Sequence, residues 1–492
     1  MILLIISLLT LANSDCIPYG VRQSLGHYYS ALNDINNYIT LTFNSQNLCL
    51  DYVVQIITAT SINNIQVTNF SLLNMTDVYK DSENVIHYET YVYDVKIGQF
   101  DSLIEGNQYT FVIYWENALI AGPFYFNVPS KSLNYSSKFI VMGDMDSNWK
   151  LNTSKQTFDW FTNQIKKTTH YDGIIYLGDM AYDLEDDNCM VGDNFLRNIS
   201  LFTSHFPFML TLGNHDSGHN DEFVYIRKSF ATPRISEYDN AIKYNDFYSF
   251  QVGHAYFVQF HPYKIAYGND DKTYFNYTLF QMEQELSRIR QHENTSWLIV
   301  YNHYPFYCSN PDDGFCEDHY KKMQLFEDLF IKYHVDLCLA GHQHTYERDE
   351  PLAYNKVAQF DKYENNTYTN PKAPIYIVEG AAGNDEIMPE DIYPPKFYTK
   401  FQAAGDGIGI LEVKNKTHLY FEHRMSANDS VVDYVWIVKT NVVPDDDDDK
   451  VKDSIPIWVW ILVGVGVLLI IALVSYCVIK NKKQQKTHNE FI

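Results

Sequence analysis

The chain has 492 residues, which is too long for one ordinary hydrophobic core, so we expect two or more folded units. Its 37 basic and 61 acidic residues give a net charge of −24, with no basic stripe, and this excludes a nucleic-acid partner. The same charge repels anionic substrates at long range, so any phosphate site must be made positive locally.

Residues 1–14 are predicted to be a secretory signal peptide. Met1–Leu11 is a short apolar run, and Ala12-Asn13-Ser14 supplies the small residues of a cleavage site. An N-terminal core strand is the alternative, because no charged segment precedes the apolar run. The mature chain is expected to begin near Asp15.

Residues 15–130 are predicted to form a small all-β domain. The region consists of short aromatic and β-branched runs separated by polar turns, without helical periodicity. Examples of these runs are 38–43, 52–58, 87–97, 109–115 and 124–128. They are typical of a β-sandwich, although an extended β subdomain of the following unit would have the same pattern.

Residues 131–440 are predicted to form an α/β domain. Apolar strands alternate with helical stretches at 153–167, 277–291 and 318–333. The chain then returns to strands at 407–413, 418–423 and 431–438. This order favours a layered α/β fold closed by antiparallel strands.

The C-terminal region is predicted to cross a membrane once. Residues 455–479 are almost wholly apolar and long enough to span a hydrocarbon core of about 30 Å. An acidic linker, 441–454, precedes them, and a tail rich in Lys, 480–492, follows, so the positive-inside rule places the tail in the cytosol. A GPI signal fits less well, because such signals end in an apolar tail. We therefore expect a single-pass type I protein of the cell surface or of a lysosome-like or vacuole-like membrane, with the large part lumenal or extracellular.

Cysteines and glycosylation sequons agree with an oxidising compartment. Cys308 and Cys316 flank a short turn and are the favoured disulfide pair, and Cys16 with Cys49 is a second expected pair. Cys338 is expected to be a buried thiol, and Cys477 lies in the predicted span. The sequons begin at Asn69, Asn74, Asn134, Asn152, Asn198, Asn276, Asn294, Asn365, Asn415 and Asn428.

Five blocks rich in Asp, Asn and His each follow a strand-like apolar run. The runs are 139–142, 174–177, 208–212, 298–300 and 335–339. The blocks are Gly143-Asp144-Met145-Asp146, Gly178-Asp179-Met180-Ala181-Tyr182, Gly213-Asn214-His215-Asp216, Val300-Tyr301-Asn302-His303 and Gly341-His342-Gln343-His344. In open α/β sheets the carboxyl ends of the strands border the ligand crevice, so we expect the blocks to meet there.

These blocks supply enough ligands for two adjacent metal ions. A pair of ions about 3.5–4 Å apart needs one bridging ligand, and Asp179 is the candidate. Asp144, Tyr182 and His344 could complete the shell of one ion, and hard oxygen ligands with a phenolate favour a trivalent metal. Asn214, His303 and His342 could complete the other, divalent, ion.

Such a centre could hydrolyse a phosphate ester by in-line attack of an activated water. His215, next to Asn214, could orient the phosphate or protonate the leaving oxygen. His319 is a further candidate, with a structural role at a helix start as its alternative, and His219 is a weaker one. His254 and His261 lie on an alternating strand and are expected to be structural.

The ordered set of blocks resembles the purple acid phosphatase branch of the calcineurin-like metallophosphoesterases, in its long, animal-type form. The similarity covers roughly residues 137–439 and is strongest in 178–197, 307–310, 341–348, 380–383 and 431–439. It implies a four-layer α/β/β/α sandwich preceded by a small fibronectin-like domain. It also implies Fe(III) held by Asp144, Asp179, Tyr182 and His344, and a divalent Fe, Zn or Mn held by Asp179, Asn214, His303 and His342. Asn214, His215 and His319 are the candidate substrate contacts.

One position departs from the family pattern. The first block of the family is Asp-x-Gly, whereas this chain has Asp146 in place of Gly. Asp146 could add an oxygen ligand, compete with Tyr182 or point away from the site. The leading hypothesis is a membrane-anchored acid phosphatase acting on small phosphomonoesters or phosphoproteins. The alternatives are an iron-independent phosphodiesterase or nucleotide phosphatase, and a cell-surface binding protein with an inactive phosphatase domain.

Overall fold

The computed structural model describes most of the chain up to residue 440. The described residues are 16–25, 39–58, 60–74, 80–81, 84–85, 88–97, 103–130, 135–146, 154–218, 223–233, 246–266, 272–291, 296–310, 315–384 and 392–440. The predicted signal peptide, acidic linker, membrane span and cytoplasmic tail lie outside these residues. In the part of the chain that is described, no helix has both the length and the apolar character needed to cross a membrane.

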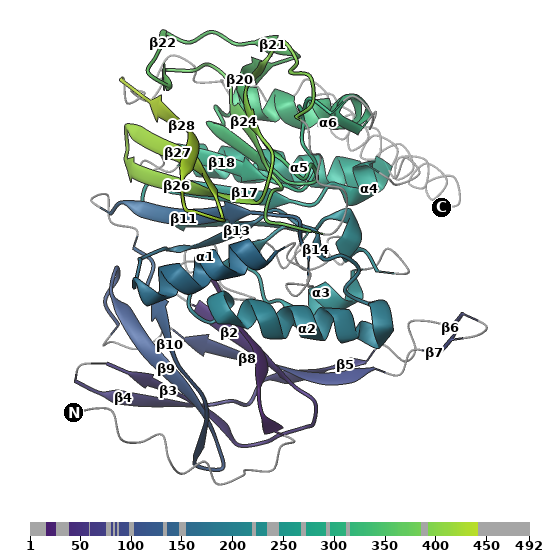
Figure 1. Ribbon diagram of the computed structural model, residues 1–492, viewed down its shortest axis with the longest axis vertical. Coiled ribbons are helices and arrows are strands. Elements are labelled where there is room, and N and C mark those ends of the chain that lie inside the picture. Colours follow the sequence, from purple (N-terminus) through teal and green to yellow (C-terminus); the bar gives the residue numbers. More distant parts are fainter. Residues whose placement is uncertain are drawn as a thin grey trace, which may run out of the picture. The chain divides into compact units, whose positions relative to one another are not determined.

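The N-terminal region is a sandwich of two four-stranded antiparallel sheets (Figure 1). The first has the order β1 (Tyr19–Leu25), β2 (Ile39–Ser45), β8 (Glu89–Ile97) and β5 (Phe70–Asn74). The second has the order β10 (Ala118–Asn127), β9 (Gln108–Trp115), β3 (Tyr52–Ile57) and β4 (Ile62–Gln66). The pair β6 (Lys80–Asp81) and β7 (Asn84–Val85) forms a small ribbon. The all-β character predicted for this region is confirmed.

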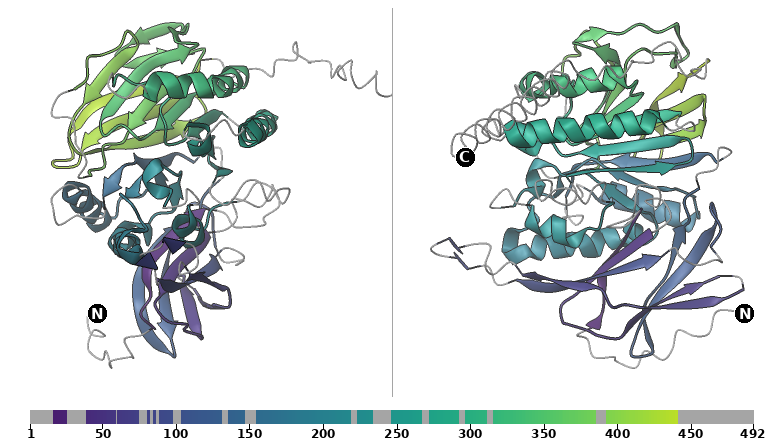
Figure 2. Two further views of the ribbon diagram at one scale, coloured as in Figure 1. Left: turned by 90° about the vertical axis from the view of Figure 1, so that its right-hand side faces the viewer. Right: turned by 180° about the vertical axis from the view of Figure 1, so that it is seen from behind.

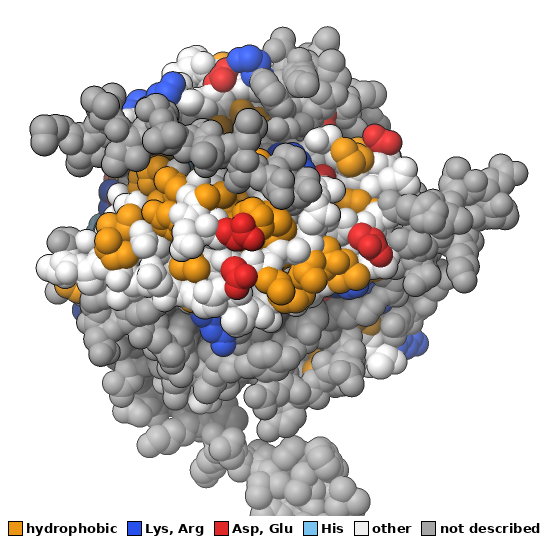
Figure 3. Space-filling view, turned by 90° about the horizontal axis from the view of Figure 1, so that it is seen from below, with side chains coloured by type: hydrophobic (Ala, Val, Ile, Leu, Met, Phe, Trp, Pro, Cys, Tyr) orange, Lys and Arg blue, Asp and Glu red, His pale blue; other side chains and the backbone are white. Residues whose placement is uncertain are grey.

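The second sandwich sheet has an unusually apolar outer face. Ile57, Ile62 and Leu119 on its strands are 37%, 61% and 48% exposed, although outward positions of antiparallel sheets are commonly polar. Ile57 and Ile62 are cross-strand neighbours. Figure 3 views the molecule from this end and shows hydrophobic side chains gathered around two acidic ones.

Two eight-stranded sheets form the core of the α/β region. One has the order β15 (Phe208–Leu210), β13 (Gly173–Tyr176), β11 (Ser137–Met142), β26 (Gly407–Asn415), β27 (His418–Met425), β28 (Val431–Val438), β23 (Thr367–Thr369) and β22 (Lys362–Glu364). The other contains β16 (Phe247–Val252), β17 (Ala255–Phe260), β18 (Trp297–Tyr301), β19 (Leu337–Ala340), β24 (Ile375–Glu379), β20 (Tyr346–Ala353) and β21 (Lys356–Val357), with β25 (Thr399–Ala403) paired to β20. The strands that precede the five blocks run parallel within each sheet.

Alternation along these strands explains the layers. On β11, Phe139 and Val141 belong to the core between the two sheets, whereas Ile140 and Met142 pack with the helices on the outer face. Phe139 contacts Phe257 of the facing sheet, with ring centroids 4.7 Å apart. Both strand faces are therefore apolar, which is why these strands read as continuous apolar runs.

Helices cover the two outer faces (Figures 1 and 2). The first face carries α1 (Lys155–Lys166), α2 (Asp186–Thr203) and α3 (Val224–Ser229). The second carries α4 (Tyr263–Ala266), α5 (Lys272–Arg290) and α6 (Phe315–Lys332). The order is helices, sheet, sheet, helices, and the predicted α/β fold is confirmed. The predicted helices correspond to α1, α5 and α6, but α5 begins at Lys272, five residues before the predicted start at 277.

The described residues fall within one compact unit, Met1–Thr440. Strand β1 of the sandwich packs on α2, where the Thr203 hydroxyl donates to the Val21 carbonyl at 2.9 Å. The boundary at residue 130 therefore stays a prediction. Both expected disulfides are present, Cys16–Cys49 and Cys308–Cys316, with Cα–Cα distances of 5.8 and 5.7 Å. Cys338 is a buried free thiol, as predicted.

Candidate metal centre

The candidate ligands gather at the carboxyl ends of five parallel strands. Asp144 follows β11, Asp179 follows β13, and Asn214 begins the short helix η4 (Asn214–Asp216) after β15. His303 follows β18, and His342 with His344 follows β19. The two strand ends that carry Asp144 and Asp179 are joined by the ribbon β12 (Met145–Asp146) and β14 (Met180–Ala181). The blocks lie at the carboxyl ends of strands, as predicted, but the site draws on both sheets and not on one.

The backbone of several candidate ligands is left-handed. The φ angles of Asp144, Asp179, Tyr182 and His342 are 62°, 52°, 51° and 71°. This region is unfavourable for residues with a Cβ and costs about 1–3 kcal/mol per residue. A cluster of such residues marks a place where the surrounding structure holds side chains in a set orientation.

Glycines let the loops approach the carboxylates. A Cβ on Gly213 would lie 2.1 Å from Oδ1 of Asp179, and a Cβ on Gly341 would lie 2.5 Å from Oδ2 of Asp144. Neither position has room for a side chain. These glycines are therefore required by the packing around the carboxylates and not only by the turns.

One group of candidate ligands surrounds Asp179. His303 Nε2 lies 3.1 Å from Oδ2 of Asp179 and 3.1 Å from Oδ1 of Asn214. His303 Nδ1 donates to the Leu177 carbonyl at 2.8 Å, which leaves Nε2 directed at the site. Donor atoms of Asp179, His303 and His342 all lie within 4.8 Å of one another. This is the spacing that a single cation needs to collect them.

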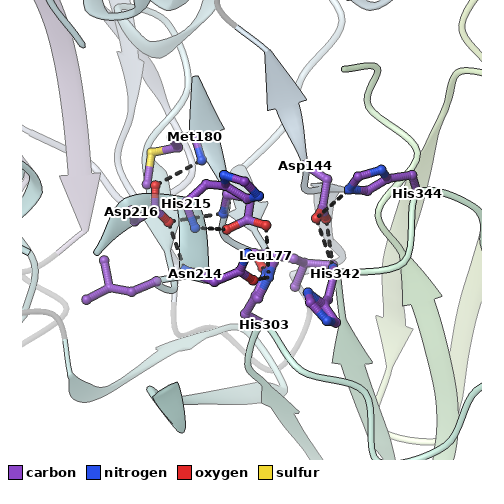
Figure 4. A network of polar contacts seen from close by, with 12 residues as sticks. Asp144, Leu177, Met180, Asn214, His215, Asp216, His303, His342 and His344 are labelled. Atoms are coloured by element: carbon purple, nitrogen blue, oxygen red, sulfur yellow. Dashed lines mark hydrogen bonds and ion pairs between the residues drawn. The ribbon is translucent and has the colours of Figure 1, made fainter. Parts of the chain in front are cut away.

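A second group surrounds Asp144. The Tyr182 hydroxyl lies 2.8 Å from His344 Nε2, and the same nitrogen lies 3.7 Å from Oδ1 of Asp144. The backbone N–H of His342 donates to both Asp144 oxygens at 3.0 Å. Figure 4 shows Asp144, His342 and His344 next to the group of Asn214, His215 and His303. The structure therefore brings all seven candidate ligands together.

The electrostatics of the two carboxylates suit a cation. Asp144 and Asp179 are 0% and 1% exposed, and among the described residues neither is paired with Lys or Arg. Burial raises the pKa of Asp144 well above its usual range. Burial also acts to raise the pKa of Asp179, but His303 outweighs it and the net direction is down. Buried carboxylates need a compensating positive charge, and metal ions would supply it.

The imidazoles fit the same donor set. Burial lowers the pKa of His344 to about 4, so that its ring is neutral, as a metal ligand must be. Burial also acts to lower the pKa of His303, but the Asp179 carboxylate beside it raises the value to about 9. Carboxylate, phenol, amide and imidazole donors in this arrangement fit a pair of metal ions.

Asp216 is a supporting residue to which the sequence analysis gave no role. Its carboxylate accepts N–H groups from Gly213 at 2.8 Å, Asp179 at 3.0 Å and Met180 at 2.9 Å. Asp216 thereby links the loops that follow β13 and β15. Burial raises the pKa of its carboxyl to about 7. The available signal was a carboxylate two residues after Asn214 at the start of a helical turn. Asn384 is a second such residue, donating to the Asp144 carbonyl at 3.1 Å.

The remaining candidates lie in different places. His215 is 21% exposed, its ring lies 4.5 Å from that of Tyr182, and its Nδ1 lies 3.4 Å from Oδ1 of Asp183. His319 lies in the first turns of α6, but its side chain is outside the described residues, as is all of His219. Only His215 is thus placed at the centre by the structure.

Asp146 and the two strand histidines occupy other surroundings. Asp146 is 3% exposed, and its backbone N–H donates to the Gly383 carbonyl at 3.0 Å. His261 Nδ1 lies 3.2 Å from the carbonyl of Leu212, the residue before Gly213. Burial lowers the pKa of the His261 imidazole. His254 is 2% exposed and receives backbone N–H groups at its carbonyl. These contacts fit the structural roles expected of His254 and His261.

Comparison with known proteins agrees with the class of fold and site. The family model of calcineurin-like phosphoesterases matches residues 137–346, and that of the iron/zinc purple acid phosphatase-like protein C matches residues 373–434. Among solved structures, a purple acid phosphatase from yellow lupin seeds superposes with a TM-score of 0.66 at 19% identity, covering 86% of this chain and 75% of that one. The α/β layers and the convergent donors define a metallophosphoesterase.

Curated relatives narrow the assignment. Acid phosphatase type 7 of Danio rerio is 32% identical over 339 residues, covering 65% of this chain and 72% of the relative. The human protein of the same name is 30% identical and covers 55% and 61%. The Fe(3+)-Zn(2+) purple acid phosphatase 12 of Arabidopsis thaliana is 29% identical and covers 64% and 66%. The chain belongs to the purple acid phosphatase family, which is a family of phosphoric monoester hydrolases.

Proposed function

We propose that this chain is an acid phosphatase that hydrolyses phosphate monoesters at a centre of two metal ions, Fe(III) and a divalent Fe, Zn or Mn. The convergence of seven donor side chains, two of which are buried carboxylates, carries the proposal. The name of the Arabidopsis relative and the description of the C-terminal family model support the choice of metals. Small phosphomonoesters and phosphoproteins are the substrates we propose.

Each donor has a role in this proposal. Asp179 would bridge the two ions, with Asp144, Tyr182 and His344 on the iron side and Asn214, His303 and His342 on the divalent side. When bound, such ions polarise phosphate oxygens and make water a strong nucleophile at low pH. His215 and Asn214 would hold the phosphate, and His215 would give a proton to the leaving oxygen. His319 remains a proposed second phosphate contact.

Membrane anchoring is a separate part of the proposal. The apolar segment 455–479 and the lysines that follow it support a type I anchor, with the catalytic region lumenal or extracellular. The two disulfides agree with an oxidising compartment. We also propose that residues 15–130 are a fibronectin-like domain, which the strand orders β1-β2-β8-β5 and β10-β9-β3-β4 support.

Two substitutions test the catalytic proposal. The purified protein should hydrolyse p-nitrophenyl phosphate in acid and show a visible tyrosinate-to-iron absorption band. Tyr182→Phe should remove the band. Asp179→Asn should lower kcat by more than about 100-fold, because a bridging ligand is lost and even the outer partners of ligands are worth about 10- to 100-fold. A colourless wild-type protein that is active only with added Mn²⁺ would instead support the iron-independent phosphoesterase.

A further inference from the structure

A polar groove lies between α1 and the turn that joins β27 to β28. Its volume is about 450 Å³, and it is lined by Gln156, Asp159, Trp160, Asn163, Gln164, Lys167, Ser426, Ala427, Asn428 and Asp429. Six of these residues form one stripe along α1 and its C-terminal cap, at helical spacing, and the other four are the first four residues of the turn. The candidate metal centre contributes none of these residues.

The groove contains a glycosylation acceptor. Asn428-Asp429-Ser430 is one of the sequons, and Asn428 is exposed at the rim. The Ser430 N–H donates to Oδ1 of Asn428 at 3.0 Å, so the side-chain carbonyl is turned toward its own backbone. This Asx-turn leaves the Asn428 amide nitrogen as the atom to which a sugar would be joined.

The turn is held firmly against α1. Asp429 accepts from Trp160 Nε1 at 2.7 Å and from Arg424 at 3.1 Å, and its φ angle is 60°. The Thr157 and Ser426 hydroxyls lie 3.0 Å apart across the same junction. A group attached to Asn428 would therefore start from a fixed point beside the helix.

The exposed stripe of α1 offers hydrogen-bonding groups to such a group. Within the described residues, the side-chain amides of Gln156 and Asn163 form no hydrogen bond, and both face the groove. Each amide provides donors and an acceptor, which match the hydroxyls and acetamido group of N-acetylglucosamine. The carboxylate of Asp159 adds a further acceptor, although Lys155 already pairs with it.

We propose that Asn428 carries an N-linked glycan and that its first N-acetylglucosamine residues lie in this groove against α1. The proposal rests on the secretory topology of the proposed function, because N-glycans are added in the lumen. The proposed modification would occupy a surface groove that contains none of the residues of the candidate metal centre.

The experiment uses the full chain expressed in eukaryotic cells and purified in detergent. Glycopeptide mass spectrometry should find a glycan on Asn428, and Asn428→Gln and Ser430→Ala should both abolish it. Asn415 is the matched control, because Thr417 N–H makes the same Asx-turn to its Oδ1 at 2.9 Å, but Asn415 ends β26 and lies outside the groove. Under native conditions, peptide N-glycosidase should release the Asn428 glycan about ten-fold more slowly than the Asn415 glycan, which corresponds to one or two net hydrogen bonds.

The double variant Gln156→Ala/Asn163→Ala distinguishes the attachment of a glycan to Asn428 from the binding of that glycan in the groove. It should keep the glycan on Asn428 but bring its release to the rate of the Asn415 glycan, with p-nitrophenyl phosphate hydrolysis unchanged. Equal release rates in the wild-type protein would overturn the docking. Glycans on other sequons with none on Asn428 would overturn the proposal but leave the proposed membrane topology intact. The absence of a glycan from every sequon would overturn both the proposal and the topology, and phosphatase activity would still be tested by its own assay.

Discussion

At the scale of single residues, Asp216 shows how the protein positions its candidate ligands. One buried carboxylate accepts three N–H groups from two loops, and one of these belongs to Asp179 itself. Supporting residues of this kind orient ligands, and losing them commonly lowers metal affinity or activity by about 10- to 100-fold.

Asp216→Asn is therefore expected to lower kcat by about 10- to 100-fold and to weaken metal retention, because the loop that carries Asn214 loses its anchor. Steady-state kinetics with p-nitrophenyl phosphate and metal analysis after dialysis measure the two effects. Asp172→Asn is the control, since Asp172 is also buried and accepts the Lys138 N–H at 2.8 Å, but at the opposite end of β13. Equal losses of kcat in both variants would contradict a specific role for Asp216.

Gly213→Ala should abolish activity while the chain still folds. The added Cβ would lie 2.1 Å from Oδ1 of Asp179, so the bridging carboxylate must move. Gly173→Ala is a matched change at the start of β13, where the nearest atom is the Pro207 carbonyl oxygen at 3.0 Å and no candidate ligand is touched. Circular dichroism and activity assays on both variants test the difference. An active Gly213→Ala protein would show that Asp179 is not held where the structure places it.

The candidate ligands could be predicted from the sequence because each directly follows an apolar strand. The direction of the strands alone, independently of the loop conformations, places five ligands at the edge of the α/β core where the strands end. They are Asp144, Asp179, Asn214, His303 and His342. The left-handed backbone of Asp179 and Tyr182 could not be predicted, because it depends on the pairing of β12 with β14. The side chain of His319 lies outside the described residues, so its role stays a prediction.

At the scale of elements, helix α2 joins the sandwich to the α/β region. Asp193 on α2 is 1% exposed and accepts the hydroxyls of Tyr19 at 3.0 Å, Tyr88 at 2.5 Å and Tyr225 at 3.0 Å. Tyr19 lies on β1 of the sandwich and Tyr225 on α3. A single carboxylate thus holds three elements of different regions.

Asp193→Ala is expected to lower the free energy of unfolding by about 3–5 kcal/mol, because three buried hydroxyls lose their acceptor. Tyr225→Phe removes only one hydroxyl and should cost about 1 kcal/mol. Urea unfolding measures both values, and limited proteolysis near residue 130 should become faster only in Asp193→Ala. Equal effects of the two substitutions would show that Asp193 is not the common acceptor.

Helix α2 also marks where prediction by periodicity failed. Its first turn contains Asp187, Asn188 and Cys189 with φ angles of 48°, 54° and 63°, so the helical pattern is interrupted. Strands β4 and β5 were not among the predicted runs either, because their sequences, INNIQ and FSLLN, do not alternate apolar with polar residues. The core strands were predicted because both of their faces are apolar. Helices α1, α5 and α6 were predicted because each has one apolar face, although the start of α5 was placed five residues late.

At the scale of the whole molecule, His205 links stability to pH. It lies after α2, its Nδ1 accepts the Tyr125 N–H at 3.4 Å, and its ring lies 4.3 Å from that of Tyr125 on β10. Burial lowers its pKa from 6.5 to about 4. Between these pH values the unfolded chain binds the proton more readily, so the free energy of unfolding falls as the pH drops.

His205→Phe should remove this acid-linked loss, which amounts to roughly 2 kcal/mol between pH 6.5 and 4. Thermal unfolding across that range should give a flatter curve for the variant than for the wild-type protein. Parallel curves would mean that His205 has the same pKa in the folded and unfolded protein and does not contribute to the pH dependence.

The central claim is that one edge of the α/β core holds two cations around Asp179. The most direct measurement is the metal content of the purified protein by mass spectrometry, compared with Asp179→Asn. We expect close to two ions per wild-type chain, with iron as one of them, and well under one ion in the variant. A wild-type chain that carries no metal and takes up none when supplied would contradict the account.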